Sequence, residues 1–288
     1  MQLKLTTFPG LEPLIHRYEK VGQQPDNLCG PYWVSLLLQV YDGLSVSAVD
    51  VALSAATVLP SQGDPADWLP SKATPRFGHN YDRIPTTPNL DACGTSVTGL
   101  IHATETLSQG RFCLVPLQTT HWVDGLDAIR NLCQTHPDWQ AVPILNVHTS
   151  YLWNFHLAPL TVLTYLQTGE LSPPLADWKV GHFALLIGQL RNESDGAGSV
   201  PLQDDAPGSD GKGHALYAVL DTYPHFGWNG LHFQPPAALA QSLQRPNQPT
   251  QGGIALFVTT KVRPHLIAVA EKVGFQIAAW DNGSPMLM

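Results

Sequence analysis

Cys29 is the residue of this chain whose position most favours chemistry. It stands where a polar loop gives way to a strongly apolar segment. The apolar residues after it recur at helical spacing and predict a helix over residues 29–41: Trp33, Leu36, Leu37 and Val40. A thiol at the amino end of a helix meets unpaired N–H groups and the positive end of the helix dipole, which favour the reactive thiolate. A buried structural cysteine is the alternative, so the partners of Cys29 must decide between the two.

Two later residues could serve Cys29 as a base and as the partner of that base. His182 opens an apolar run of strand length, and Asp221 closes a second such run 39 positions later. This separation is too long for a hairpin, but residues 191–213 are dominated by loop-forming residue types and predict a loop insertion. Without the insertion, His182 and Asp221 would face each other on neighbouring antiparallel strands. The cysteine could then attack an acyl carbon while the histidine moves the proton and the aspartate fixes the tautomer of the imidazole.

An amide side chain precedes Cys29 on the same loop. Gln23 lies six residues before Cys29. Together with the backbone N–H of Cys29, it could donate to the oxyanion that forms during acyl transfer, and one such donor contributes about a hundredfold in rate. Gln24 is the neighbouring alternative for this role.

The chain resembles the papain-like cysteine peptidase superfamily and, within it, the phytochelatin synthases and the bacteriocin-leader (double-glycine) peptidases. The resemblance rests on four motifs in this order: Gln23, Cys29-Gly30, Gly181-His182-Phe183 and Val219-Leu220-Asp221. The stretch from Val219 to Pro224 with Trp228, followed by the segment 235–239, is also similar to the region after the third catalytic residue in phytochelatin synthases. Two features depart from the pattern: Tyr32 stands where a small residue is common, and no tryptophan directly follows Cys29.

The resemblance implies an α+β, papain-like fold in which the nucleophile-bearing helix packs on an antiparallel sheet that carries the histidine and the aspartate. We expect a single catalytic domain over residues 1–288, with a helical first part at about 1–110 and a sheet-rich part at about 111–288. Expected helices are 29–41, 45–58 with Ser45 as N-cap, 96–107, 122–135, 160–167, 235–243 and 264–273. Expected strands are 111–117, 141–147, the His182 and Asp221 runs, and 253–259. The proline-rich tract 60–88 is expected to form an ordered loop across the cleft.

Composition restricts the classes of partner. The 288 residues, 43% of them hydrophobic, are enough for a substantial core, and a net charge of -8 argues against a nucleic-acid partner. No stretch is long and apolar enough for a membrane span or a signal peptide, so we expect a cytoplasmic protein without a membrane partner. The four cysteines form no C-x-x-C pair and the 12 histidines form no H-x-x-x-H motif, so we expect reduced thiols, no metal and no cofactor.

Some residues compete for the assigned roles. Cys93 also precedes a glycine and a predicted helix, and is the alternative nucleophile, although Thr87 rather than a glutamine stands six residues before it. Should Asp221 not be the partner of His182, Asn229 or Asn146 would be the substitute.

Four residues are candidate substrate contacts. The segment after the strand at 141–147 presents polar and aromatic side chains in succession, as pocket-lining segments often do. The candidates for substrate binding are Trp33, Asn146, His148 and Trp153.

The leading functional hypothesis is cysteine-dependent acyl-enzyme catalysis on a peptide, isopeptide or γ-glutamyl amide, by a peptidase or a transpeptidase. The substrate would be a peptide or an amide-bearing small molecule. One alternative is an acyltransferase that uses a thioester or carrier-bound donor in natural-product biosynthesis. The other is a papain-like protein that binds peptides without catalysis.

Overall fold

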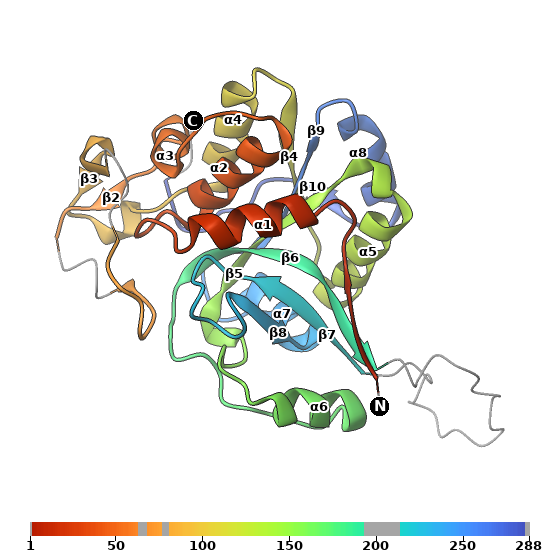
Figure 1. The fold of residues 1–288 in the computed structure, drawn as a ribbon. Coiled ribbons are helices and arrows are strands. Elements are labelled where there is room, and N and C mark those ends of the chain that lie inside the picture. Colours follow the sequence, from red (N-terminus) through yellow and green to blue (C-terminus); the bar gives the residue numbers. More distant parts are fainter. Residues whose placement is uncertain (1, 63–67, 77–80, 193–213, 286–288) are drawn as a thin grey trace.

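An antiparallel sheet forms the centre of the protein in the computed structural model, which describes residues 2–62, 68–76, 81–192 and 214–285 (Figure 1). Within these ranges, the strand order is β10-β4-β9-β5-β6-β7-β8, and β1 pairs with β6 beside β5. The strands are β1 (Leu3–Thr7), β4 (Phe112–Gln118), β5 (Val142–His148), β6 (Gly181–Asn192), β7 (Ala215–Leu220), β8 (Leu231–Gln234), β9 (Gly253–Thr259) and β10 (Gln276–Ile277). A separate parallel pair joins β2 (Leu59–Pro60) to β3 (Thr86–Thr87).

Helices cover the sheet. They are α1 (Glu12–Val21), α2 (Cys29–Tyr41), α3 (Ala48–Ser54), α4 (Val97–Leu107), α5 (Trp122–Thr135), α6 (Pro159–Thr168), α7 (Pro236–Gln244) and α8 (Arg263–Lys272). Figure 1 shows α1 to α4 gathered in one group, in which α2 packs against β6 and α4 against β4. Helix α7 packs against β5, β7 and β9, and α5 packs on α7. The fold is therefore α+β with an antiparallel sheet, as the sequence predicts.

Helix α2 occupies the middle of the hydrophobic core. Residues 30–38 are all buried, because apolar side chains cover nearly every side of this helix rather than one stripe. A helix with apolar side chains on all sides is stable only where other elements pack around it. It lies between α1, α3 and α4 on one hand and β6 on the other.

Several elements have the predicted bounds, and others need correction. Helices α2 and α5 and strand β9 begin and end where the sequence predicts. The helix expected over 45–58 spans Ala48–Ser54, because Ser47 rather than Ser45 caps it in a reciprocal box with Asp50. Strand β1, helix α1 and the short strands β8 and β10 were not expected.

Two further expectations fall partly on segments outside the described residues. Strand β6 continues through Asn192, so residues 191 and 192 belong to the sheet, whereas 193–213 lie outside the described residues. Within the tract 60–88, the structure describes Pro60 in β2, a short 3-10 turn at Tyr81–Arg83, and β3, but not 63–67 or 77–80. Further 3-10 turns are Leu90–Ala92, Pro137–Trp139 and Thr149–Tyr151. None of the helices in the described ranges has the length and apolar character that a membrane crossing requires.

Strand β6 has two partners along one edge. Its first half pairs with β5, from Gly181 to Leu185, and its second half pairs with β1, from Gly188 to Asn192. The change of partner requires a glycine, because a Cβ at Gly188 would lie 2.2 Å from the carbonyl oxygen of Thr6. At Gly181, by contrast, the nearest atoms to a Cβ belong to Arg245 at 3.9 Å.

We therefore predict opposite outcomes for two alanine substitutions on the same strand. Gly188→Ala should lower the free energy of unfolding by about 2 kcal/mol or more, since the new methyl group meets backbone. Gly181→Ala should change it by less than about 0.5 kcal/mol. Urea denaturation of both variants provides the measurement, and equal stabilities would contradict the close contact of β1 with β6.

Candidate active site

Two contacts to Phe183 fix the start of α2 on β6. A Cβ at Gly30 would lie only 3.0 Å from the ring of Phe183, so the absence of a side chain lets the helix start approach the strand. One turn later, the indole N–H of Trp33 donates to the carbonyl oxygen of Phe183 at 3.1 Å. Because His182 is the neighbour of Phe183, both contacts place Cys29 beside His182.

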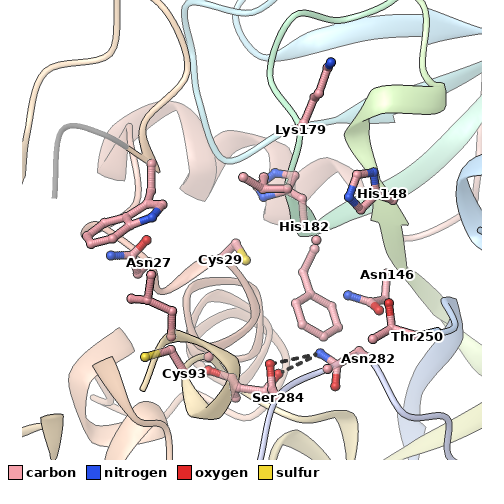
Figure 2. A pocket seen from close by; sticks show the side chains of 18 of the residues that line it. Asn27, Cys29, Cys93, Asn146, His148, Lys179, His182, Thr250, Asn282 and Ser284 are labelled. Atoms are coloured by element: carbon pink, nitrogen blue, oxygen red, sulfur yellow. Dashed lines mark hydrogen bonds between the residues drawn. The ribbon is translucent and has the colours of Figure 1, made fainter. Parts of the chain in front are cut away.

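Cys29 is the first residue of α2 and is partly exposed. No side chain caps this helix start, so the N–H groups of the first turn are available to a ligand or to the thiolate. Figure 2 shows Cys29 at the end of its helix, with His182 beside it.

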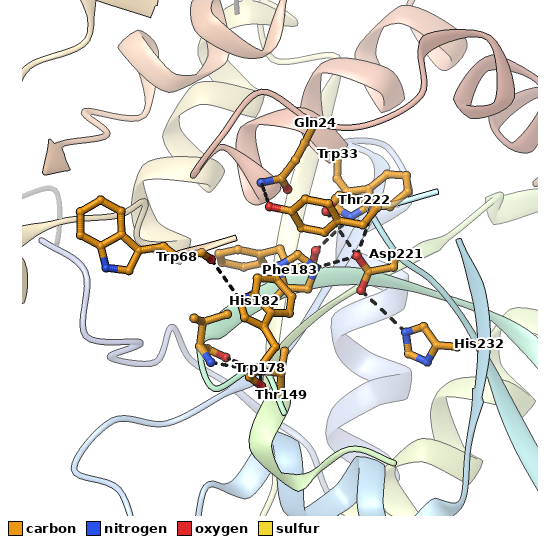
Figure 3. Close-up of polar contacts among 12 residues, drawn as sticks. Gln24, Trp33, Trp68, Thr149, Trp178, His182, Phe183, Asp221, Thr222 and His232 are labelled. Carbon is orange, nitrogen blue, oxygen red and sulfur yellow. Dashed lines mark hydrogen bonds and ion pairs between the residues drawn. The ribbon is translucent and has the colours of Figure 1, made fainter. Parts of the chain in front are cut away.

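His182 lies between Cys29 and Asp221. Leu185 of β6 pairs with Leu220 of β7, so the aspartate that follows β7 comes within reach of the histidine that opens β6. The Nε2 atom of His182 is 3.1 Å from Oδ1 of Asp221 (Figure 3). The thiol of Cys29 lies on another side of the ring, close enough to contribute to the raised pKa of His182. With Nε2 directed to the carboxylate, Nδ1 is the nitrogen left for the thiol.

The electrostatics of this arrangement favour a charged imidazole. Burial alone lowers the pKa of His182, but the Asp221 carboxylate and Cys29 outweigh burial and raise that pKa to about 10. Burial likewise raises the pKa of Asp221, while His182 opposes it and holds that pKa well below its usual range. At neutral pH the pair is therefore an imidazolium beside a carboxylate.

Aromatic rings shield the His182–Asp221 pair from water. The ring of Trp178 packs edge-on against His182 with centroids 4.9 Å apart, and Tyr223 stacks on it at 6.1 Å. Tyr223 also donates its backbone N–H to Oδ1 of Asp221 at 3.1 Å. A low-dielectric environment of this kind strengthens the ion pair.

A pocket with a volume of about 530 Å³ opens over Cys29 and His182. Its lining combines polar and apolar side chains. Figure 2 shows Asn146, His148 and Thr250 on one side of Cys29 and Cys93 on the other. Apolar residues 58–60 accompany Cys93, since Val58 bridges to Gly94. Such a volume accommodates a short peptide segment or a comparable small molecule.

The structure corrects the assignment of the loop glutamine. Gln23 does not line the pocket: its amide donates to the carbonyl oxygen of Thr74 at 2.8 Å. Gln24, the alternative, is buried and lines the pocket, with its amide donating to the hydroxyl of Tyr223 at 3.2 Å. The side-chain amide near Cys29 is thus supplied by Gln24, because the turn before α2 directs the Gln23 side chain outward.

Two of the four expected substrate contacts line the pocket. Figure 2 shows the amide group of Asn146 turned toward the pocket, and its Oδ1 accepts from Arg245 at 2.7 Å and from Trp280 at 3.0 Å. His148 hydrogen-bonds Ser150 and Gln248, and burial together with Arg245 lowers its pKa to about 4, so it is a neutral lining group at pH 7.

The other two expected contacts are structural residues. Trp33 of α2 is fully buried against α1 and β6, and its indole N–H donates to the carbonyl oxygen of Phe183. Trp153 is buried against Tyr165 and does not line the pocket. Both tryptophans are core residues, and the local sequence pattern does not distinguish them from residues that line a pocket.

The competing residues have other partners. Cys93 lines the pocket, but its thiol donates to the carbonyl oxygen of Asn89 at 3.4 Å and burial raises its pKa. Asn229 occupies a left-handed turn position with φ 52° between β7 and β8. Asn146 is held by Arg245, so neither asparagine takes the place of Asp221 beside His182. In the described ranges, no three His, Cys, Asp or Glu side chains gather as a metal site would require.

Several residues of the site were not expected from sequence. Trp178 and Arg245 lie in loop-like segments without a recognisable pattern. His232 and Gln234 did carry a signal, because two polar residues alternate with Phe233 in an otherwise apolar segment and so share one face of β8.

We predict that Cys29 is the fast-reacting thiol of the four. Burial raises the pKa of Cys93 and Cys113, and raises that of Cys133 to about 12, whereas Cys29 has an imidazolium beside it. Iodoacetamide at pH 7 should alkylate Cys29 about tenfold or more faster than the others, and His182→Ala should remove this advantage. Peptide mass spectrometry over time gives the rates, with Cys93→Ala as the control that keeps the fast phase. A fast phase that follows Cys93 would overturn the assignment.

Comparison with known proteins assigns a family without a described activity. A family model described as a family of unknown function (DUF6885) matches residues 8–281. No curated protein and no solved structure matches the chain. Because the family model covers nearly the whole chain, including Cys29, His182 and Asp221, the protein belongs to this family of unknown function.

Proposed function

We propose that the protein is a cysteine-dependent acyl-transfer enzyme of papain-like fold that acts on a peptide or another amide. One observation carries the proposal: His182 lies between Cys29 and Asp221, with Nε2 hydrogen-bonded to the carboxylate and Nδ1 left for the thiol, at the wall of an open pocket. A binding protein would not need this set of groups together.

The reaction begins with attack of the Cys29 sulfur on the carbonyl carbon of the amide. The C=O electrons move to oxygen and form an oxyanion. When the oxyanion collapses, the C–N bond breaks and His182 transfers its proton to the departing amine, which leaves an acyl thioester on Cys29. Water or an amine then attacks the thioester and passes its proton to His182, and the breaking C–S bond restores the thiolate–imidazolium pair.

The oxyanion would be stabilised by groups at the start of α2. The N–H groups of the first helical turn carry no side-chain cap, and Gln24 presents its amide to the same pocket. The Gln24 amide has two N–H bonds, of which one donates to Tyr223. The second N–H, with the backbone N–H of Cys29, is suited to the oxyanion.

The pocket lining favours a substrate with an apolar part and a polar part. Leu59, Pro60 and Trp68 contribute apolar lining, whereas Asn146, Gln248 and Thr250 contribute polar lining. This combination suits a peptide or amide substrate that carries both an apolar side chain and hydrogen-bonding groups. Water or an amine as the acceptor corresponds to a peptidase or a transpeptidase.

Trapping of the acyl-enzyme tests the proposal without knowledge of the natural substrate. Incubation with activated acyl donors, such as p-nitrophenyl esters and peptide thioesters, should add one acyl group to Cys29 and release the leaving group in a burst. Cys29→Ala should form no adduct, and Cys93→Ala should form it normally. Intact-protein and peptide mass spectrometry identify the site. Wild-type protein that stays unmodified across the donor panel, or an adduct on Cys93, would refute the proposal.

The two neighbouring glutamines provide a matched pair for the oxyanion site. Gln24→Ala should slow acylation by about a hundredfold, since it removes a donor used in the transition state. Gln23→Ala should change the rate less than about threefold, because its amide bonds Thr74 instead. Burst kinetics with one activated ester measure both. A larger loss in Gln23→Ala than in Gln24→Ala would return the role to Gln23.

A further inference from the structure

The two oxygens of the Asp221 carboxylate have different surroundings. The side chain is 1% exposed, so each oxygen depends on protein donors. Oδ1 accepts from the His182 ring, from the Tyr223 backbone N–H and from the Thr222 hydroxyl at 3.4 Å. Oδ2 faces a second imidazole: Nε2 of His232 lies 3.7 Å away, as Figure 3 shows.

The tautomer of His232 follows from its other neighbour. The Oε1 atom of Gln234 accepts from the backbone N–H of Trp153 at 2.7 Å, which fixes which end of the amide is nitrogen. That nitrogen donates to the Trp153 carbonyl oxygen and to Nδ1 of His232, both at 3.1 Å. Since Nδ1 of His232 accepts a hydrogen bond, its proton resides on Nε2 and points to the Asp221 carboxylate.

We infer that His232 is a positioning residue, which holds the Asp221 carboxylate in place for His182 and is itself oriented by Gln234. The inference deepens the proposed function and rests on it for its catalytic meaning. Polar groups follow one another from the backbone of Trp153 through Gln234 and His232 to Asp221, with 3.7 Å between Nε2 of His232 and Oδ2, and from Asp221 to His182 and Cys29. Gln234 and His232 come from β8, so this strand has a part in the site although it contributes no residue that touches Cys29.

Burial makes the second histidine necessary. His232 is 2% exposed and Gln234 is completely buried, so no bulk water can substitute for a missing donor. Without His232, Oδ2 would lose its neighbouring imidazole in a buried region, where Phe155 packs on His232 and Phe226 stacks on Phe155. Asp221 would then hold a proton more readily or rotate, and either change weakens its hydrogen bond to His182. The electrostatics of Asp221 agree with a positioning role: burial raises the pKa of this carboxyl group, whereas His182 and His232 both lower it.

Three variants separate positioning from packing. His232→Phe keeps a ring of similar size against Phe155 but removes the donor. His232→Gln keeps a donor on a smaller side chain. Phe155→Leu alters the packing on His232, whose ring centroid lies 4.9 Å from that of Phe155, and changes no polar atom. Thermal unfolding of all three reports the effect on the fold.

The rate of Cys29 alkylation at pH 7 and the rate of acylation by an activated ester are the functional readouts. His232→Phe should slow both by about tenfold, the scale of one hydrogen bond to a charged group. His232→Gln should stay within about threefold of wild type, and Phe155→Leu should lower the Tm without slowing alkylation. If folded His232→Phe alkylates like wild type, or if Phe155→Leu slows alkylation as much, the positioning role is wrong.

Nuclear magnetic resonance of protein labelled with 15N-histidine tests the chain independently of any substrate. The long-range 1H–15N spectrum should show His232 protonated at Nε2 and unprotonated at Nδ1, with its signals assigned by their loss in His232→Gln. Protonation of His232 at Nδ1 alone would overturn the inference. Because this spectrum and the alkylation rate need no acyl donor, a correct tautomer and slowed alkylation alongside a failed acyl-enzyme trap would reject the proposed reaction and keep the positioning role.

Discussion

The docking of α2 onto Phe183 is the constraint on which the rest of the site depends. Gly30 lets the helix start approach the ring, and the Trp33 indole donates to the carbonyl oxygen of the same residue. One strand residue thus receives both a van der Waals contact and a hydrogen bond from the helix. The thiol and the imidazole are then neighbours as a result of core packing, and a rigid core holds them more accurately than a loop could.

Buried charge is the second constraint. The Asp221 carboxylate is removed from water, so its oxygens depend on polar groups of the protein, and these groups come from β6, from the segment after β7 and from β8. Its own backbone N–H is fixed by the carbonyl oxygen of Gly230 at 2.8 Å. A carboxylate satisfied in this way is costly to desolvate but well defined in orientation. The aromatic residues Trp178 and Tyr223 pack on His182 and complete the surroundings of the His182–Asp221 pair.

The sequence predicted the local elements and the residues with the strongest patterns. The periodicity after Cys29 located α2 to the residue, and the loop-like composition after β6 correctly indicated that His182 and Asp221 could approach. Local patterns failed where tertiary contacts decide. Whether Gln23 or Gln24 faces the pocket depends on the backbone conformation of the turn before α2. The sequence around Trp33 is compatible with a core residue and with a pocket residue. His232 and Gln234 alternate with Phe233 on a strand of only four residues, and so short an alternation was not recognised in the sequence. The activity itself remains a proposal, since the family that the chain matches has no described function.

The double pairing of β6 ties the first residues of the chain to the site. The half of β6 that carries His182 pairs with β5, and the other half pairs with residues 3–7. Proteolytic trimming of those residues, although they lie far from the thiol in sequence, would leave the backbone groups of half of β6 without partners along one edge. Residues 3–7 are therefore part of the scaffold of the site, although none of them lines the pocket.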